Sequence, residues 1–221
     1  MFFPSHDATT ANHPDLLATS GNFLRMLEIH DDRIALKSLL NNNKSSEFNS
    51  SLTSFDLADF DVHHMATSSV DTTCAIWDIA TETLDTKLVV HDKQVYDISW
   101  GGFNIFALVS GDGSLRIFDL REKDRSTIVY ENPIQGCPLL RLEWNKRDPE
   151  LLATVGLDSN KVVILDIRNV SDETQNRAQP QLEPDMWYNR SMAEINNARW
   201  SPIDLNWIAI AFLNKFQVLN V

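Results

Sequence analysis

Short apolar stretches alternate with turns centred on Asp or Gly along most of the chain. Three of the resulting segments align with one another: ATSSVDTTCAIWDI (66–79), ALVSGDGSLRIFDL (107–120) and ATVGLDSNKVVILDI (153–167). Each holds a short apolar strand, an Asp-centred turn and a second strand that ends in a bulky residue followed by Asp. Weaker copies occupy 16–29 and 208–221. The pattern predicts an all-β chain of repeated antiparallel strands.

The repeat recurs every 41 to 54 residues, measured between the bulky residues that precede Asp or its counterpart. A second marker, an aromatic residue that closes an apolar stretch, recurs at Phe55, Trp100, Trp144 and Trp200. Four short strands within such a period are typical of one blade of a β-propeller. A single blade cannot bury both of its faces, so the blades must stack on one another around an axis.

The repeat also predicts the organisation of the chain. Residues 1–168 hold four blades, at about 14–48, 49–90, 91–135 and 136–168. Residues 169–193 are polar, include Pro180 and Pro184 and show little strand pattern, so they are predicted to form a linker. Residues 194–221 are predicted to form the remnant of a further blade.

Composition narrows the kinds of partner. The chain is 43% hydrophobic, which is enough for a folded core, and it lacks an apolar run long enough to span a membrane. The net charge of −12 opposes contact with nucleic-acid phosphates, so direct nucleic-acid binding is not expected. Cys74 and Cys137 fit no metal spacing or disulfide framework, which favours reduced thiols in the nucleus and cytoplasm. No metal and no cofactor are expected.

Longer strings resemble one family of WD-repeat proteins. They include PDLLATSGNFLR (14–25), LLNNNKSSEF (39–48), HDKQVYDISWGG (91–102) and EINNARWSPIDLNWIAIAFLNKFQVLNV (194–221). The chain resembles the plant light-regulated WD proteins and the transparent-testa-glabra WD protein, together with their animal adaptor relative. That family is seven-bladed. Because the chain begins at a place internal to the family, and 169–193 replaces a whole blade, the resemblance implies about five of seven blades.

An incomplete ring has three possible outcomes. Five blades could close into a tighter ring, the ring could stay open and expose strand edges, or the chain could be a truncated or divergent copy that folds poorly. The truncated or divergent copy is the outcome favoured by the resemblance. A monomer is expected.

The resemblance implies a hydrogen-bond network within each blade. It joins a His before the first strand, a Ser or Thr in the second strand, an Asp in the next turn and a Trp in the third strand. The matching residues are Ser69, Asp71 and Trp77 in one unit, His91, Ser110 and Asp112 in the next, and Asp158 in the third. Because every copy is partial, the blades should depend mainly on apolar packing.

The resemblance implies a protein-interaction scaffold that holds transcription factors of the MYB and basic helix–loop–helix types, or kinases. Candidate contact residues lie in turns ahead of first strands, at His91-Asp92 and at Asn196-Asn197, with the Asp158 turn as another candidate. The alternative is that these residues are merely solvated.

A second hypothesis concerns two arginines. FDLR (118–121) and LDIR (165–168) resemble the Asp-x-Arg ending used by WD-repeat substrate receptors of cullin–RING ubiquitin ligases. Arg121 and Arg168 would then pair with acidic residues of the ligase adaptor in a bidentate geometry. The alternative is that each Arg satisfies the Asp of its own blade.

No catalytic residue is predicted. Propeller enzymes need convergent His, Glu or Asp side chains on the inner strands. ATSS, ALVS and ATVG, which are taken as inner strands, carry small apolar or hydroxyl residues instead. His91 with Asp112 could form half of a catalytic pair, but the repeat favours a structural contact. We therefore expect a protein that is not an enzyme.

Overall fold

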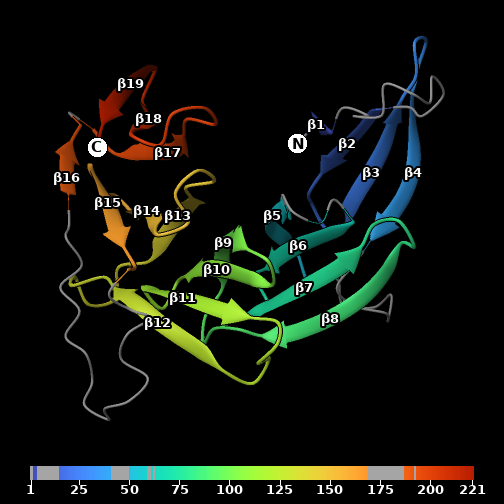
Figure 1. The fold of residues 1–221 in the computed structure, drawn as a ribbon, viewed down its shortest axis with the longest axis horizontal. Coiled ribbons are helices and arrows are strands. Elements are labelled where there is room, and N and C mark those ends of the chain that lie inside the picture. The colour runs from blue at the N-terminus through green and yellow to red at the C-terminus, as the bar shows by residue number, and fades with distance from the viewer. Residues whose placement is uncertain are drawn as a thin grey trace.

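The structure, a computed structural model, describes residues 2–3, 15–40, 50–58, 61, 63–168, 187–191 and 193–221. These residues form strands and turns, and none of them belongs to a helix that is long and apolar enough to cross a membrane. The described strands build five antiparallel sheets that lie side by side along an arc (Figure 1). The prediction of an all-β, incomplete propeller is confirmed.

The sheets follow one another in chain order. The first contains β1 (Phe2–Phe3), β2 (Asp15–Thr19), β3 (Leu24–Ile29) and β4 (Ile34–Leu40). The second contains β5 (Leu52–Leu57), β6 (His64–Ser69), β7 (Thr73–Asp78) and β8 (Thr83–Val89). The third contains β9 (Val95–Gly102), β10 (Ile105–Ser110), β11 (Ser114–Asp119) and β12 (Ser126–Glu131). The fourth contains β13 (Leu139–Trp144), β14 (Leu151–Gly156), β15 (Lys161–Asp166) and β16 (Trp187–Arg190). The fifth contains β17 (Ile195–Trp200), β18 (Trp207–Phe212) and β19 (Lys215–Asn220).

The predicted linker at 169–193 includes part of a sheet. Residues 187–190 form β16, which pairs with β15 through Val162↔Asn189 and Val163↔Tyr188 and supplies the fourth strand of the fourth sheet. Residues 169–186 and 192, like 4–14 and 41–49 in the first predicted blade, lie outside the described residues. The first sheet also takes in β1, ahead of residue 14.

Apolar residues bind neighbouring sheets together because successive side chains of a strand point to opposite faces. In β10, Phe106 and Leu108 pack toward the second sheet, whereas Ala107 and Val109 pack toward the fourth. Each pair of neighbouring sheets encloses one such cluster. The repeated large residues of the sequence are therefore the contacts between blades.

The innermost strands differ from those expected. Contacts between sheets run through β5, β9, β13 and β17, which line the inside of the arc (Figure 1). The segments ATSS, ALVS and ATVG belong to β6, β10 and β14, the second strand of each sheet. Which strand faces the axis depends on how the sheets stack, and the alternation within one strand does not reveal it.

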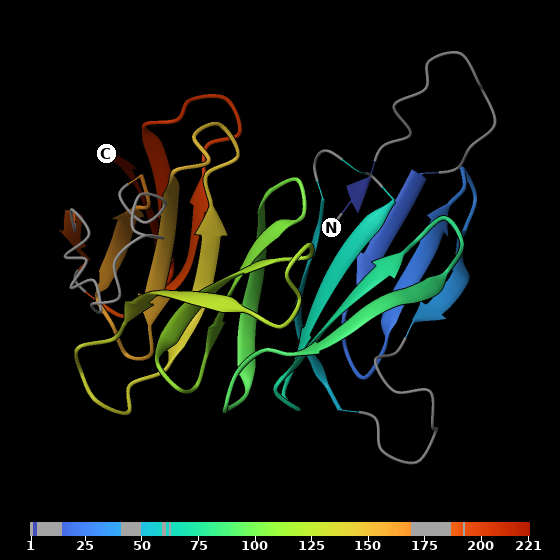
Figure 2. The same cartoon turned by 60° about the horizontal axis from the view of Figure 1, so that its bottom comes forward.

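The arc is open. Figures 1 and 2 show the first and fifth sheets at its two ends, with the other three between them. No apolar cluster of the described residues joins these two end sheets. Of the three outcomes considered for an incomplete ring, the described residues adopt the open one.

Candidate protein-interaction surface

A polar network holds the turn between β10 and β11 against the connection that precedes β9. The Nδ1 atom of the buried His91 lies 2.9 Å from Oδ2 of Asp112. The hydroxyl of Ser114 donates to Oδ1 of Asp112 over 2.7 Å. Burial opposes ionisation of Asp112, but hydrogen bonds from Ser114 and His91 outweigh it and lower the pKa of Asp112 to about 2. The carboxylate is therefore a strong acceptor that fixes the turn.

The His91–Asp112 pair has a structural role. Burial lowers the pKa of His91 despite the nearby Asp112 carboxylate, which favours a neutral ring that carries its proton on Nδ1. The side chain of His91 is 0% exposed, and its Nε2 atom has no hydrogen-bond partner among the described residues. Because solvent does not reach the imidazole, it is poorly placed to act as a base on a substrate.

Ser110 belongs to the same turn but not to the His91 contact. Its hydroxyl donates to the carbonyl of Lys93 over 3.2 Å and accepts from the backbone N–H of Asp112 over 3.2 Å. Phe118, which replaces the expected Trp, stacks on Phe106 with ring centroids 5.6 Å apart. At this position of the third sheet, an apolar ring contact thus takes the place of the hydrogen bond that a Trp would donate.

The second sheet uses a different hydroxyl from the one predicted. Nε1 of Trp77 donates to Oγ1 of Thr67 over 3.0 Å, whereas Ser69 donates to the carbonyl of Ser51. Trp77 pairs with Met65 in the register of β6 and β7, so Thr67 is its diagonal neighbour. Ser69 lies two residues farther along β6, beyond the reach of the indole. Asp71 is held within its own turn, where its carboxylate accepts from Thr73.

The Asp158 turn of the fourth sheet has a tight-turn backbone but lacks the side-chain hydrogen-bond network expected within a blade. Asp158 has a φ of +53°, in the left-handed region that Asp tolerates better than most residues. Its side chain makes no hydrogen bond to another described residue. The positions that correspond to Ser and Trp hold Gly156 and Leu165, as the sequence indicates.

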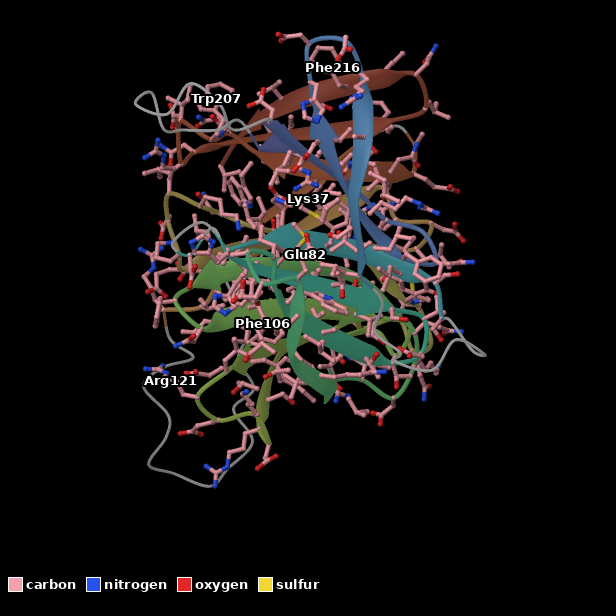
Figure 3. The ribbon with its side chains drawn as sticks, turned by 90° about the vertical axis from the view of Figure 1, so that its right-hand side faces the viewer. Lys37, Glu82, Phe106, Arg121, Trp207 and Phe216 are labelled. Atoms are coloured by element: carbon pink, nitrogen blue, oxygen red, sulfur yellow. The ribbon has the colours of Figure 1, made fainter. Side chains whose placement is uncertain are left out.

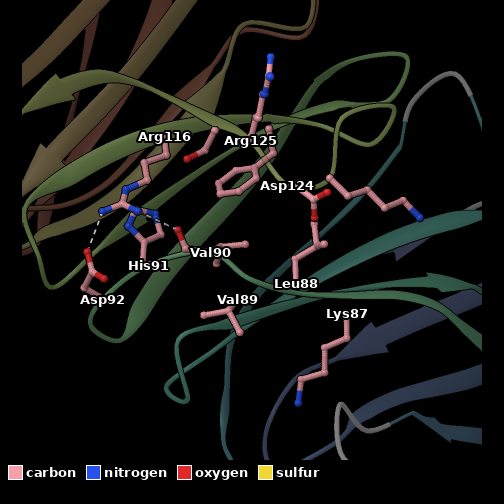
Figure 4. Close-up of a pocket in the computed structure, with 12 residues that line it drawn as sticks. Lys87, Leu88, Val89, Val90, His91, Asp92, Arg116, Asp124 and Arg125 are labelled. Carbon is pink, nitrogen blue, oxygen red and sulfur yellow. Dashed lines mark hydrogen bonds and ion pairs between the residues drawn. The ribbon is translucent and has the colours of Figure 1, made fainter.

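Asp92 lies at the rim of a cavity between the second and third sheets. The cavity has a volume of about 430 Å³, and its walls include Leu88, Val90 and Phe118 (Figure 4). The Asp92 side chain is 84% exposed, and its carboxylate lies 3.1 Å from Nη2 of Arg116 (Figure 4). Asp92 is therefore accessible to a partner and already oriented by a neighbouring guanidinium.

Asn196 and Asn197 lie within β17 and not in the turn ahead of it. Both are exposed, and a bulge between Ile195 and Asn197 explains why two consecutive side chains face solvent. The carbonyl of Asn196 accepts from Nε of Arg141 over 3.2 Å, which ties β17 to β13.

Arg121 and Arg168 occupy equivalent turns after the third strands of adjacent sheets. Nε of Arg121 donates to the two oxygens of Asp119 over 2.9 and 3.0 Å, and Nη2 also donates to Asp119. Arg168 binds Asp166 in the same bidentate way. The bond from Arg121 lowers the pKa of Asp119, and that from Arg168 lowers the pKa of Asp166.

These arginines nevertheless remain on the surface. Their side chains are 67% and 61% exposed for Arg121 and Arg168 respectively. Each is thus held by the Asp of its own blade, as the alternative hypothesis states, while most of its side chain is exposed. The backbone N–H groups of both arginines also donate to Oδ1 of Asp119 and Asp166. In the equivalent turn of the second sheet the backbone N–H of Ala80 donates to Oδ1 of Asp78 in the same way, without an Arg side chain.

The innermost strands contain carboxylates, one buried and two half-buried, that the sequence pattern did not single out. Oδ2 of Asp56 accepts from the backbone N–H of Trp100 over 2.8 Å, and Oδ2 of Asp97 accepts from Leu142 over 3.0 Å. Glu143 pairs with Arg199 of β17. Each carboxylate therefore joins one sheet to the next. A position beside the repeated aromatic, as in Asp56 and Glu143, was the available signal.

These carboxylates do not form a metal site. No group of three or more His, Cys, Asp or Glu side chains in the described part of the chain is arranged to hold a metal ion. Oδ2 of Asp56 also accepts from Nζ of Lys146 over 3.1 Å, so the charge is already compensated. The arrangement holds blades together.

Comparison with known proteins finds relatives that match much or all of the chain. No protein-family model matches it. It is 44% identical over 261 residues to a protein of Dictyostelium discoideum named as a DDB1- and CUL4-associated factor 7 homolog, and the match covers 100% of this chain and 78% of the relative.

Two fungal proteins match over shorter lengths. An uncharacterised WD repeat-containing protein of Schizosaccharomyces pombe is 36% identical, over 69% of this chain and 40% of the relative. A WD repeat-containing protein of Saccharomyces cerevisiae is 41% identical, over 53% of this chain and 26% of the relative. Both fungal relatives are named for the kind of repeat that the strand pattern predicts.

Proposed function

The chain belongs to the WD-repeat family that includes the Dictyostelium relative, and we propose that it is a non-enzymatic scaffold that joins a cullin ligase through the adaptor DDB1. The observation that carries this proposal is the pair of exposed Asp-x-Arg turns at Arg121 and Arg168, on adjacent sheets. The name of the relative, a DDB1- and CUL4-associated factor, points to the same partner.

The turns suit recognition of an acidic surface. Arg presents five N–H donors in a planar fork, and its own Asp engages only Nε and Nη2 of Arg121. Holding the guanidinium in place reduces the side-chain entropy that binding would otherwise cost. A carboxylate of the adaptor could therefore add to the pair without rearranging the turn.

The test is recovery of purified DDB1 by the chain and by the double variant Arg121→Ala, Arg168→Ala. We expect the variant to recover DDB1 about tenfold less well or worse, because buried charge-assisted contacts dominate such interfaces. The variant should fold, since the equivalent turn of the second sheet closes with Ala80. The matched control is Arg125→Ala, another exposed Arg with a side chain 84% exposed. Equal recovery by the double variant would overturn the proposal.

A second proposed role is the one implied by the resemblance to the plant proteins, assembly of MYB and basic helix–loop–helix transcription factors or kinases in the nucleus and cytoplasm. A scaffold of this kind would use the surface near Asp92, Asn196 and Asn197. The name of the relative favours the ligase role over this one. The same recovery assay distinguishes the two roles when those partners replace DDB1 and Asp92→Ala replaces the double arginine variant.

A further inference from the structure

The fifth sheet has one face that no other described sheet covers. The third strands of the fourth and fifth sheets align as KVVILD and KFQVLN. In β15, Val162 and Ile164 point toward the next sheet and are 0% and 4% exposed. Their counterparts in β19, Phe216 and Val218, are 78% and 49% exposed. The positions that join sheets elsewhere are therefore apolar but open here.

The neighbouring strand extends this face. In β14, Ala153 points toward the next sheet and is buried, whereas its counterpart Ala209 in β18 is half-buried. Trp207, at the start of β18, is 40% exposed. Figure 3 shows Trp207 and Phe216 on the fifth sheet, far from Arg121. We call this set the front face; it consists of Trp207, Ala209, Ala211, Phe216 and Val218.

The first sheet carries the complementary face, which no other described sheet covers and in which Leu17 and Leu27 are half-buried. In the fourth sheet, Leu152 and Leu165 point back toward the third sheet and are 0% and 1% exposed. Their counterparts are Leu17 of β2 and Leu27 of β3, which pair in register and continue to Leu36 of β4.

These three leucines lie outside the cluster that joins the first and second sheets, and Leu36 is 55% exposed. We call Leu17, Leu27, Leu36 and the 62%-exposed Ile34 the back face.

We propose that the chain self-associates head to tail, with the front face of the fifth sheet packed on the back face of the first sheet in a second copy. The fold uses this front-to-back packing between each pair of neighbouring sheets, so the contact would continue an interface that the chain already makes. The two uncovered halves lie at opposite ends of the arc (Figure 2). This departs from the expected monomer.

A second copy fits better than an unrelated apolar partner. Within the chain, Val162 and Ile164 of the fourth sheet belong to one apolar cluster with Ile208 and Leu219 of the fifth. In the proposed contact, Phe216 and Val218 would meet Leu17 and Leu27, which pair in register as Ile208 and Leu219 do and are likewise aliphatic. Contiguous apolar surface of this kind marks an interface. The contact is heterologous, so it repeats from copy to copy.

The test is a cross-linking experiment with two chains that each carry one accessible cysteine. Both carry Cys137→Ser, and the remaining Cys74 is 0% exposed, so the reagent should not reach it. One chain carries Leu17→Cys and the other Val218→Cys, and a short bis-maleimide is added to each alone and to the mixture. We expect a cross-linked dimer in the mixture and little in either chain alone. Dimers of the Val218→Cys chain alone would indicate a symmetric contact and overturn the proposal, as would the absence of dimers.

Sedimentation of the unmodified sequence gives an independent measurement. We expect a mass that rises with concentration, and Phe216→Lys should weaken the association by about tenfold or more. Because Phe216 is exposed, this change should leave the fold intact. Phe103→Lys, at a residue 67% exposed in the turn between β9 and β10, is the matched control and should associate normally. A monomer at every concentration would overturn the proposal.

Discussion

The Glu143 carboxyl is subject to two opposing effects. Its side chain is 12% exposed, and burial raises its pKa to about 7 although Arg199 binds it and favours ionisation. The carboxylates of Asp56 and Asp97 add to the rise. Burial also raises the pKa of Asp97. The inner strands thus hold acidic groups whose ionisation opposes folding.

This predicts a pH dependence of stability. Unfolding returns Glu143 to its ordinary pKa, so between about pH 4.5 and 7 the unfolded chain binds fewer protons at this site than the folded one. The contribution of Glu143 to the free energy of unfolding should therefore fall as pH rises through that window, by up to about 3 kcal/mol, and level off above it. The lowered pKa of His91 acts in the opposite direction up to its ordinary pKa, so the Glu143 contribution is isolated by comparison with a variant.

Glu143→Gln should remove this contribution, because the amide does not titrate. The difference in unfolding free energy between the variant and the natural chain, measured by urea unfolding at several pH values, should grow in favour of the variant as pH rises from 5 to 7. Asp112 contributes only below this window, because its pKa is lowered to about 2. A difference that stays constant with pH would contradict the prediction.

The sequence pattern located residues of the hydrogen-bond networks but did not always show which side chains bond to each other. The repeat located Trp77, His91 and Asp112, and the structure brings His91 and Asp112 together. It did not distinguish Thr67 from Ser69, because both lie on one face of the same strand. Only the pairing register of β6 and β7 decides which hydroxyl the indole reaches.

At the scale of strands and turns, the apolar pattern was a good guide. The aligned segments at 66–79, 107–120 and 153–167 each form two paired strands. The pattern did not show which strands line the inside of the arc, since that depends on contacts between sheets. The polar run at 169–193 concealed β16, because a short outer strand needs little apolar sequence.

The turn between β10 and β11 requires glycine for two separate reasons. Gly113 has a φ of +85°, and a Cβ there would lie 2.9 Å from the carbonyl oxygen of Cys137. Gly136 has a φ of +79° but nothing within 4 Å of an added Cβ. Substitution at Gly136 therefore measures the cost of backbone strain alone, whereas substitution at Gly113 adds the cost of steric overlap.

Gly136→Ala should destabilise the chain by about 1 kcal/mol, the cost of the left-handed backbone alone. Gly113→Ala should cost at least about 1 kcal/mol more, since the third sheet must also move away from the connection ahead of β13. Thermal or urea unfolding of both variants measures the difference. Equal destabilisation would show that the backbone at Cys137 yields without cost.

At the scale of the whole molecule, an open arc differs from a closed ring in having ends. Each internal sheet packs on two neighbours, whereas the first sheet packs on the second alone among the described residues. Stability in such an arrangement is approximately the sum of sheet and interface contributions. A local defect should then spread only as far as the interfaces that it weakens.

Met26→Ala tests this behaviour. Met26 is 2% exposed and belongs to the cluster between the first and second sheets, so its truncation should cost about 2 to 5 kcal/mol locally. Amide hydrogen exchange should accelerate in β2 to β7 and remain unchanged in β13 to β19. Phe106→Ala, in the cluster between the second and third sheets, should instead accelerate exchange around β5 to β11. Uniform acceleration by both variants would show that the five sheets unfold as one unit, as expected of a ring in which every blade has two neighbours.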